Sequence, residues 1–173
     1  SDAIQTILTL KRNPDVLLRD VAGMRERIER DRPALSPWDM KNRRGGLVDI
    51  EFIAQYLQLK FASERPEILD TNTENALEKL TTAKLLDKNK SVALITALRL
   101  WRNIQGVVRL SVGENFDKPN LPDGCRNFIA NASGCNNFEQ LQFSIAEKAN
   151  ECHKIYRDLI EEPFQKLAAR AEK

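Results

Sequence analysis

The residues with the greatest potential for chemistry lie together between residues 40 and 57. This stretch reads Met40-Lys41-Asn42-Arg43-Arg44-Gly45-Gly46-Leu47-Val48-Asp49-Ile50-Glu51-Phe52-Ile53-Ala54-Gln55-Tyr56-Leu57. Adjacent glycines permit positive φ and close approach by a ligand or another backbone. A helix beginning at Leu47 would leave its first N–H groups unpaired, and the positive end of its dipole favours an anion. The sequence therefore predicts that Gly45 and Gly46 face a phosphate or substrate, although a tight helix entry explains the two glycines about equally well. The basic residues that would assist are Lys41, Arg43 and Arg44.

Asp49 is expected to be a structural residue. At helical pitch it shares an edge with Phe52, Ile53 and Tyr56, and a carboxylate beside such side chains must be paired or hydrogen-bonded. Three basic residues could serve as its partner: Arg25, Lys41 and Arg44. We favour an ion pair with Arg25, which adjoins the apolar edge of the preceding helix.

Glu51 is expected to point elsewhere. Residues two apart on a helix do not face each other, so Asp49 and Glu51 are not expected to hold one metal ion together. Glu51 shares a narrow polar strip with Gln55 and Gln58. The sequence therefore predicts that Glu51 and Gln55 meet a neighbouring domain or a bound nucleotide.

Several catalytic arrangements are missing from the sequence. A single histidine, His153, leaves no Ser/His/Asp arrangement, and there is no Walker-type loop and no Asp-x-Asp pair for two magnesium ions. The three cysteines include no CxxC, and Cys152 directly beside His153 is poor spacing for zinc. We therefore expect no catalytic residue, metal site or cofactor in this chain.

Composition indicates a folded domain in a reducing cytoplasm. The 173 residues are 42% apolar, and 27 Lys+Arg against 25 Asp+Glu give a net charge of +2. This near-neutral charge does not indicate strong electrostatic binding to nucleic acid. No apolar run reaches the roughly 18 residues that a membrane-spanning helix needs. The odd cysteine count and the absence of a signal-peptide pattern favour free thiols in the cytoplasm.

The sequence predicts that all the elements that position these residues are helices. Apolar spacings of three and four predict helices at about 4–10, 15–31, 47–61, 89–111, 125–130 and 138–160, with a continuation of the last one past Pro163 left open. A further helix should carry Ala76, Leu77 and Leu80, with possible caps at residues 70–73. The second should bury a face of Val16, Leu17, Val21, Met24 and Ile28. The third is apolar on two sides, which predicts a central helix. Gly113 should end the long helix, and residues 114–124 should form a loop.

No segment alternates as a strand would, so the predicted fold is all-α, an irregular helical bundle. We expect a single domain over 1–173, with a motif-bearing helical core at 1–112 and a loop plus C-terminal helices at 113–173. The chain starts inside a helical pattern, which leads us to expect a fragment of a longer protein.

Three segments carry a family resemblance. They are Val21-Ala22-Gly23-Met24-Arg25-Glu26-Arg27, Asp39-Met40-Lys41, and the run from Gly45 to Leu57. Together they resemble the helical domain of glutamine synthetase adenylyltransferase, the bifunctional glutamate–ammonia ligase adenylyltransferase. That domain carries a Gly-Gly-x-x-[Asp/Glu]-Ile-Glu-Phe signature and occurs after each of two nucleotidyltransferase domains. The form of the motif here, and an ending near Glu161, look like the second, carboxy-terminal copy. Tail segments at Gly113–Asp117 and Pro122–Gly124 also resemble the family.

The resemblance implies a place in nitrogen regulation. The family transfers AMP from ATP, with Mg²⁺, to a tyrosine of glutamine synthetase and removes it again under the PII signal protein. Expected partners are therefore the upstream nucleotidyltransferase domain, glutamine synthetase and PII, with no membrane partner. The catalytic motifs would lie upstream of Ser1, so this chain alone should be inactive. One departure is Arg43-Arg44, where the family often has glycine or proline before the Gly-Gly pair.

Two other functional classes remain open. A stand-alone helical adaptor for protein partners would carry a large exposed apolar patch on an otherwise complete domain. A weak nucleic-acid-binding domain would gather Lys and Arg on one surface and bind in a salt-sensitive way.

Overall fold

Local signals in the sequence account for where the helices begin. A computed structural model describes residues 2–111 and 122–171. Its helices are α1 (Asp2–Leu8), α2 (Pro14–Asp31), α3 (Leu47–Phe61), the 3₁₀ turn η1 (Pro66–Ile68), α4 (Thr73–Thr82), α5 (Lys88–Ser111), α6 (Asp123–Ala132), α7 (Phe138–Tyr156), the π-helical segment η2 (Arg157–Glu161) and α8 (Glu162–Ala171). Across these described ranges there is no strand. The predicted all-α bundle is confirmed.

Asparagine side chains cap three of these helices. The side chain of Asn13 accepts hydrogen bonds from Asp15 N and Val16 N at the start of α2, where Pro14 occupies the first turn. Asn72 and Asn137 cap α4 and α7 in the same way. A side-chain oxygen at this position satisfies N–H groups that have no partner within the helix, so each cap fixes a helix start locally.

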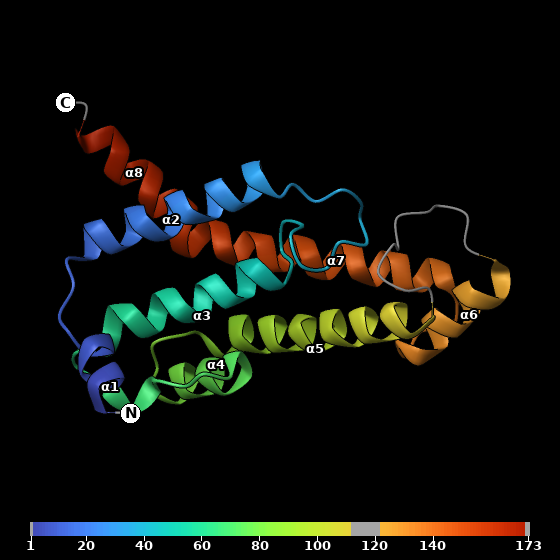
Figure 1. The fold of residues 1–173 in the computed structure, drawn as a ribbon, viewed down its shortest axis with the longest axis horizontal. Helices are drawn as coiled ribbons and strands as arrows, with labels where there is room; N and C mark the ends of the chain where they lie inside the picture. The colour runs from blue at the N-terminus through green and yellow to red at the C-terminus, as the bar shows by residue number, and fades with distance from the viewer. Residues whose placement is uncertain (1, 112–121, 172–173) are drawn as a thin grey trace.

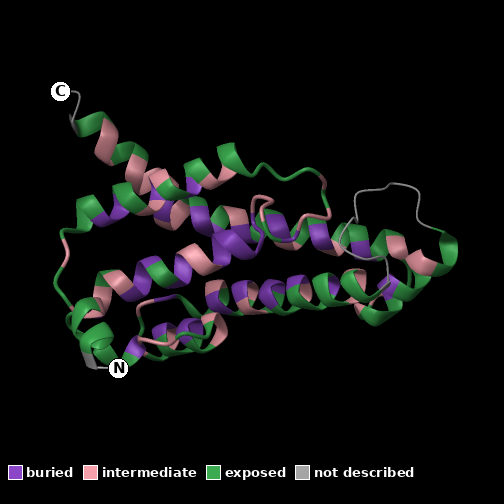
Figure 2. Cartoon of the chain, viewed as in Figure 1, coloured by how far each residue is buried: buried purple, intermediate pink, exposed green. Residues whose placement is uncertain are grey.

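Helix α3 lies at the centre of the bundle (Figure 1). It packs against α2, α4, α5 and α7, and Ile50 and Ile53 are completely buried. Figure 2 shows buried residues along α3 and along the sides of its neighbours that face it. The central position predicted from its two apolar sides is confirmed, because a helix apolar on opposite sides must be covered on both.

The chain after residue 122 completes the same core. Leu141, Ile145 and Ala149 of α7 belong to one apolar cluster with Ile50 of α3 and Leu98 of α5. Helix α7 continues through η2 into α8 without a break in helical structure, and α8 packs across α2 (Figure 1).

The buried face of α2 differs from the predicted one. Leu18, Ala22 and Arg25 are buried, whereas Val16 and Met24 are 51% and 53% exposed. The face is rotated toward Arg25 because α2 packs against both α3 and α8. The prediction was wrong for Val16 and Met24, since it placed the apolar side chains inside and the arginine at the edge.

Two further expectations concern other parts of the chain. Gly113 as a helix stop, and most of the predicted loop, lie outside the described residues. No helix within the described ranges is long and apolar enough to cross a membrane.

Candidate functional site

The loop before α3 closes over the start of that helix. Gly46 N donates to Arg43 O at 2.9 Å, Leu47 N to Met40 O at 2.8 Å, and Val48 N to Lys41 O at 3.2 Å. The loop carbonyls thus satisfy groups that a helix start would otherwise leave free. The expectation of unpaired N–H groups at this helix start is wrong for these residues, and an anion would have to displace the loop to reach them.

Gly45 is held from three sides. Its φ is +74°, and a Cβ built there would lie 1.9 Å from the backbone oxygen of Ala149 on α7. The indole Nε1 of Trp101 donates to Gly45 O at 3.1 Å, and Gly45 N donates to Oδ2 of Asp49 at 2.6 Å. Glycine is therefore required both for backbone conformation and for the close approach of α7.

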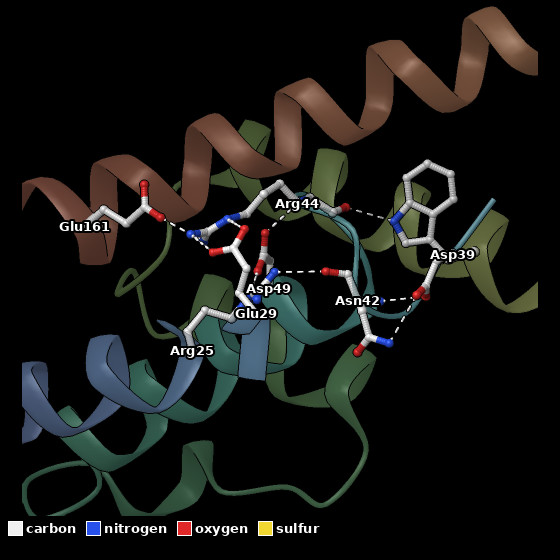
Figure 3. Close-up of polar contacts among 9 residues, drawn as sticks. Arg25, Glu29, Asp39, Asn42, Arg44, Asp49 and Glu161 are labelled. Atoms are coloured by element: carbon white, nitrogen blue, oxygen red, sulfur yellow. Dashed lines mark hydrogen bonds and ion pairs between the residues drawn. The ribbon is translucent and has the colours of Figure 1, made fainter. Parts of the chain in front are cut away.

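Asp49 and Arg25 form a fully buried ion pair. Arg25 Nε donates to Asp49 Oδ1 at 2.5 Å, and neither side chain has exposed surface. The guanidinium also donates through Nη2 to Asn42 O at 3.1 Å, and Figure 3 shows these groups between α2 and the loop. Of the three partners that the sequence left open for Asp49, the structure pairs it with Arg25. Both carboxylate oxygens accept hydrogen bonds from the protein, one from Arg25 and one from Gly45.

Arg44 joins the loop to α2 and to η2. Its Nη2 and Nε donate to Glu29 of α2 at 2.5 and 3.0 Å, and Nη1 lies 2.8 Å from Glu161 Oε1 in η2 (Figure 3). Its guanidinium carbon lies 6.0 Å from the ring centroid of Tyr156. Partial burial lowers the pKa of Arg44, but the charges of Glu161 and Glu29 outweigh it and raise the pKa above its ordinary value. Arg44 therefore remains a cation shared between two carboxylates.

The other two basic residues of the loop differ in exposure. Arg43 Nη1 donates to Pro37 O at 2.5 Å, and its guanidinium carbon lies 6.0 Å from the ring centroid of Trp101. Burial lowers the pKa of Arg43. Lys41 is exposed. Of the basic residues predicted to gather around an anion, the structure turns two into the protein and leaves Lys41 facing solvent.

The three residues of the polar strip on α3 differ in how far they are buried. Gln58 is buried and accepts from Asp70 N at 2.7 Å, whereas Glu51 is half-buried and Gln55 is exposed. Glu51 and Gln55 therefore lie apart from the enclosed loop, on a different side of the helix from Asp49. The two cavities that Gln55 lines among the described residues include none of Gly45, Gly46 and Arg44.

Sequence reasoning missed three members of this polar cluster: Glu29, Trp101 and Glu161. Glu29 follows Arg25 by four residues, a spacing that puts both on one side of α2 and that could have identified it. Trp101 could have been identified from its side chain, because a buried indole N–H needs a hydrogen-bond partner. Nothing in the sequence indicates that Glu161 approaches Arg44. Among the residues described, no three His, Cys, Asp or Glu side chains are grouped so as to hold a metal ion.

Comparison with known proteins identifies the family. A family model described as GlnD PII-uridylyltransferase matches residues 17–160. A bifunctional glutamine synthetase adenylyltransferase/adenylyl-removing enzyme from Rhodopseudomonas palustris is 36% identical over 157 residues, which cover 91% of this chain and 16% of that protein. Proteins of the same name from a Bradyrhizobium strain and from Xanthobacter autotrophicus are 34% and 31% identical, over 93% and 92% of this chain and 16% of each relative.

The chain thus spans 16% of the length of the curated relatives it matches. Their shared name agrees with the resemblance carried by the Gly-Gly motif and the helix after it. This chain belongs to the family that the GlnD PII-uridylyltransferase model describes, and it corresponds to a region of glutamine synthetase adenylyltransferase.

Proposed function

We propose that residues 1–173 form a helical domain of an enzyme that adenylylates and deadenylylates glutamine synthetase. The domain supports the adenylylating site, while the groups that hold Mg²⁺ and ATP belong to a nucleotidyltransferase domain elsewhere in the polypeptide. The same whole-protein activity implies glutamine synthetase and PII as partners of the parent enzyme.

The observation that carries this proposal is the engagement of Asp49 within the protein. This carboxylate belongs to the family motif, yet both its oxygens accept hydrogen bonds from Arg25 and Gly45. A carboxylate that coordinates a catalytic metal must have an oxygen that the ion can reach, whereas the side chain of Asp49 has no exposed surface. Releasing Asp49 would leave Arg25 buried without its partner. The motif therefore serves to join helices, and the chemistry is supplied by other residues.

The accessible candidates for contact with the rest of the enzyme are Lys41, Glu51 and Gln55. The other residues of the loop have a structural role in this proposal. Gly45 and Gly46 are buried, and Arg43 and Arg44 bind groups of the protein itself, so these four residues fix the conformation of the loop. Lys41 remains suited to an acidic surface or a phosphate group.

The experiment is transfer of labelled AMP from ATP to glutamine synthetase. The isolated chain should transfer none, and the full-length polypeptide should be active with Mg²⁺. In the full-length enzyme, Lys41→Ala should raise KM for ATP or for glutamine synthetase with a much smaller change in kcat, because a contact made equally in ground and transition states acts on KM. Transfer by the isolated chain would overturn the proposal, and an unchanged KM for both substrates would remove Lys41 from the binding surface.

A helical adaptor for a protein partner is the second candidate. It is favoured by the exposed apolar side chains near the start of the chain, which include Ile4 and Ile7 at 66% and 58% exposure. A stand-alone adaptor would take no part in AMP transfer, so an assay in which the full-length polypeptide transfers no AMP to glutamine synthetase would favour this candidate over the first.

A further inference from the structure

Helix α5 carries basic side chains and no acidic one. Its 24 residues include Lys88, Lys90, Arg99, Arg102 and Arg109 but no aspartate or glutamate, although the net charge of the whole chain is only +2. An ordinary solvated helix surface mixes charges of both signs. The local excess of positive charge on α5 therefore favours an acidic partner.

The two arginines in the second half of the helix are unpaired. Arg99 binds Glu74 of α4. Arg102 and Arg109 are exposed and form no ion pair or hydrogen bond with the residues that the structure describes, and Arg102 acts on Glu74 through its charge alone. Because seven residues of helix separate these arginines, they lie on one side of α5 with their Cα atoms about 10 Å apart. Both guanidinium groups are thus available to carboxylates of another molecule.

Gly106 lies between these arginines and has no structural role in the domain. It is exposed in the interior of α5, and its φ is not positive. Apart from its chain neighbours and the backbone of its own helix, no atom of the described residues lies within 4 Å of a Cβ built there. Glycine destabilises a helix interior relative to alanine, and neither backbone conformation nor packing requires it at this position. What the missing side chain does allow is close approach by another backbone.

An apolar side chain borders the same opening. Residues three and four positions away are neighbours on a helix surface. Around Gly106 these neighbours are Arg102, Asn103, Arg109 and Leu110. Leu110 is 89% exposed, more than any other large apolar side chain among the described residues, whereas Asn103 is engaged through its Nδ2 with Ala132 O of α6 at 2.9 Å. The opening therefore combines room for a backbone with one apolar contact and two cations.

We propose that this face of α5, formed by Arg102, Gly106, Arg109 and Leu110, docks an acidic α-helical segment of a partner protein. The partner helix crosses α5 over Gly106 and covers Leu110, and its carboxylates accept charge-assisted hydrogen bonds from the two guanidinium groups. A helix is the occupant because the distance between two packed helix axes depends on the side chains at the contact, and glycine shortens it. Nucleic acid fits less well, because Leu110 would face the phosphates and only two unpaired cations meet them.

The probe is a dye-labelled, alanine-based helical peptide. It carries two glutamates seven residues apart, to match Arg102 and Arg109, with alanine and leucine between them. Fluorescence anisotropy measures its binding to the chain, and the same peptide with glutamine in place of both glutamates is the control. The glutamate peptide should bind about tenfold or more tightly than the glutamine peptide, and its affinity should fall as salt is raised.

Gly106→Ala separates binding from stability. The added methyl should raise the urea midpoint of unfolding, yet weaken binding of the glutamate peptide by about threefold or more, because it holds the two backbones apart. Gly23→Ala is the matched control, since Gly23 lies within α2 with the same open space around a built Cβ. That change should raise the midpoint as well and leave the peptide affinity unchanged.

A double variant tests the charges. Arg102→Gln with Arg109→Gln should weaken binding of the glutamate peptide by about tenfold or more. Arg19→Gln with Arg27→Gln removes the same charge from exposed positions on α2 and should weaken it much less.

Equal affinities of the two peptides, or an affinity unchanged by both Gly106→Ala and the double variant of α5, would overturn the proposal. A short DNA duplex that binds more tightly than the glutamate peptide, and loses binding in the same variants, would assign the face to nucleic acid and would also overturn it. Self-association of the chain that the double variant of α5 abolishes would assign the face to a second copy, with the same consequence.

Discussion

At the scale of single residues, Gly45 carries the strictest requirement in the chain. Positive φ disfavours a side chain by itself, and the backbone of Ala149 leaves no room for one. The motif glycine is therefore explained by contact between two helices without reference to any ligand. Gly134 offers a comparison, because its φ is +76° and nothing lies within 4 Å of a Cβ built there.

Gly45→Ala should prevent stable folding or lower the free energy of unfolding by several kcal/mol. Gly134→Ala should lower it by only about 1–2 kcal/mol, the cost of a left-handed conformation. Urea unfolding of both variants measures the difference. Equal losses would show that α7 can move away from the loop at little cost.

Asp49→Ala should destabilise the domain by about 3–5 kcal/mol, because it leaves the buried guanidinium of Arg25 without its charge partner. Glu51→Ala, on the half-buried strip two residues later, should change stability by about 0.5 kcal/mol or less. Thermal and urea unfolding compare the two variants. A larger effect for Glu51→Ala would contradict the environments that the structure assigns to these carboxylates.

At the scale of elements, the loop of residues 40–46 joins helices that lie far apart in the chain. It contacts α2 through Arg25 and Glu29, α5 through Trp101, and η2 through Glu161. A π-helical segment is uncommon, and here it supplies the carboxylate that approaches Arg44. The loop therefore helps determine how α8 lies across α2.

Arg44→Ala should lower the free energy of unfolding by about 1.5–3 kcal/mol, the range for hydrogen bonds to charged groups. Arg30→Ala is the matched control, because Arg30 forms an ion pair with the neighbouring Asp31 and its side chain is 75% exposed. That change should stay within about 0.5 kcal/mol. Urea unfolding measures the free energy of unfolding of both variants. If Arg44→Ala were as stable as Arg30→Ala, Arg44 would not stabilise the fold and would be a candidate for ligand binding.

At the scale of the whole molecule, two buried groups of the core make stability depend on pH in the alkaline range. Cys152 lies in α7 without exposed surface, and burial raises the pKa of its thiol from 9.0 to about 12. Burial likewise raises the pKa of the neighbouring core residue Tyr156. Because both groups hold their protons more tightly in the folded state, their contribution to stability is complete below the unfolded pKa and is lost as pH rises.

The free energy of unfolding should therefore fall between about pH 9 and pH 12, with a slope of up to about 1.4 kcal/mol per pH unit for each proton. Cys152→Ala should reduce this slope by up to about 1.4 kcal/mol per pH unit, the contribution of one proton. Urea unfolding across this pH range measures it. Identical slopes for the wild-type protein and Cys152→Ala would mean that the buried thiol does not contribute.

The sequence by itself determined the helices and the central place of α3. Apolar spacing acts within a few residues, so it can be recognised from the local sequence, and two opposed apolar stripes allow only a buried helix. The Gly-Gly motif indicated a tight entry to that helix and led to the family. Asp49 was recognisable as a carboxylate that needs a partner, with Arg25 favoured.

The tertiary structure alone decided what surrounds the loop. Ala149, Trp101 and Glu161 approach it from distant parts of the chain, and no local pattern encodes that meeting. The same is true of α2, where the apolar side chains predicted its inner face, but packing against α3 and α8 rotated Arg25 inward and left Val16 and Met24 outside. Helix periodicity reports which residues share a side, whereas the choice of the buried side depends on all neighbours at once, including the ion pair that makes burial of an arginine possible.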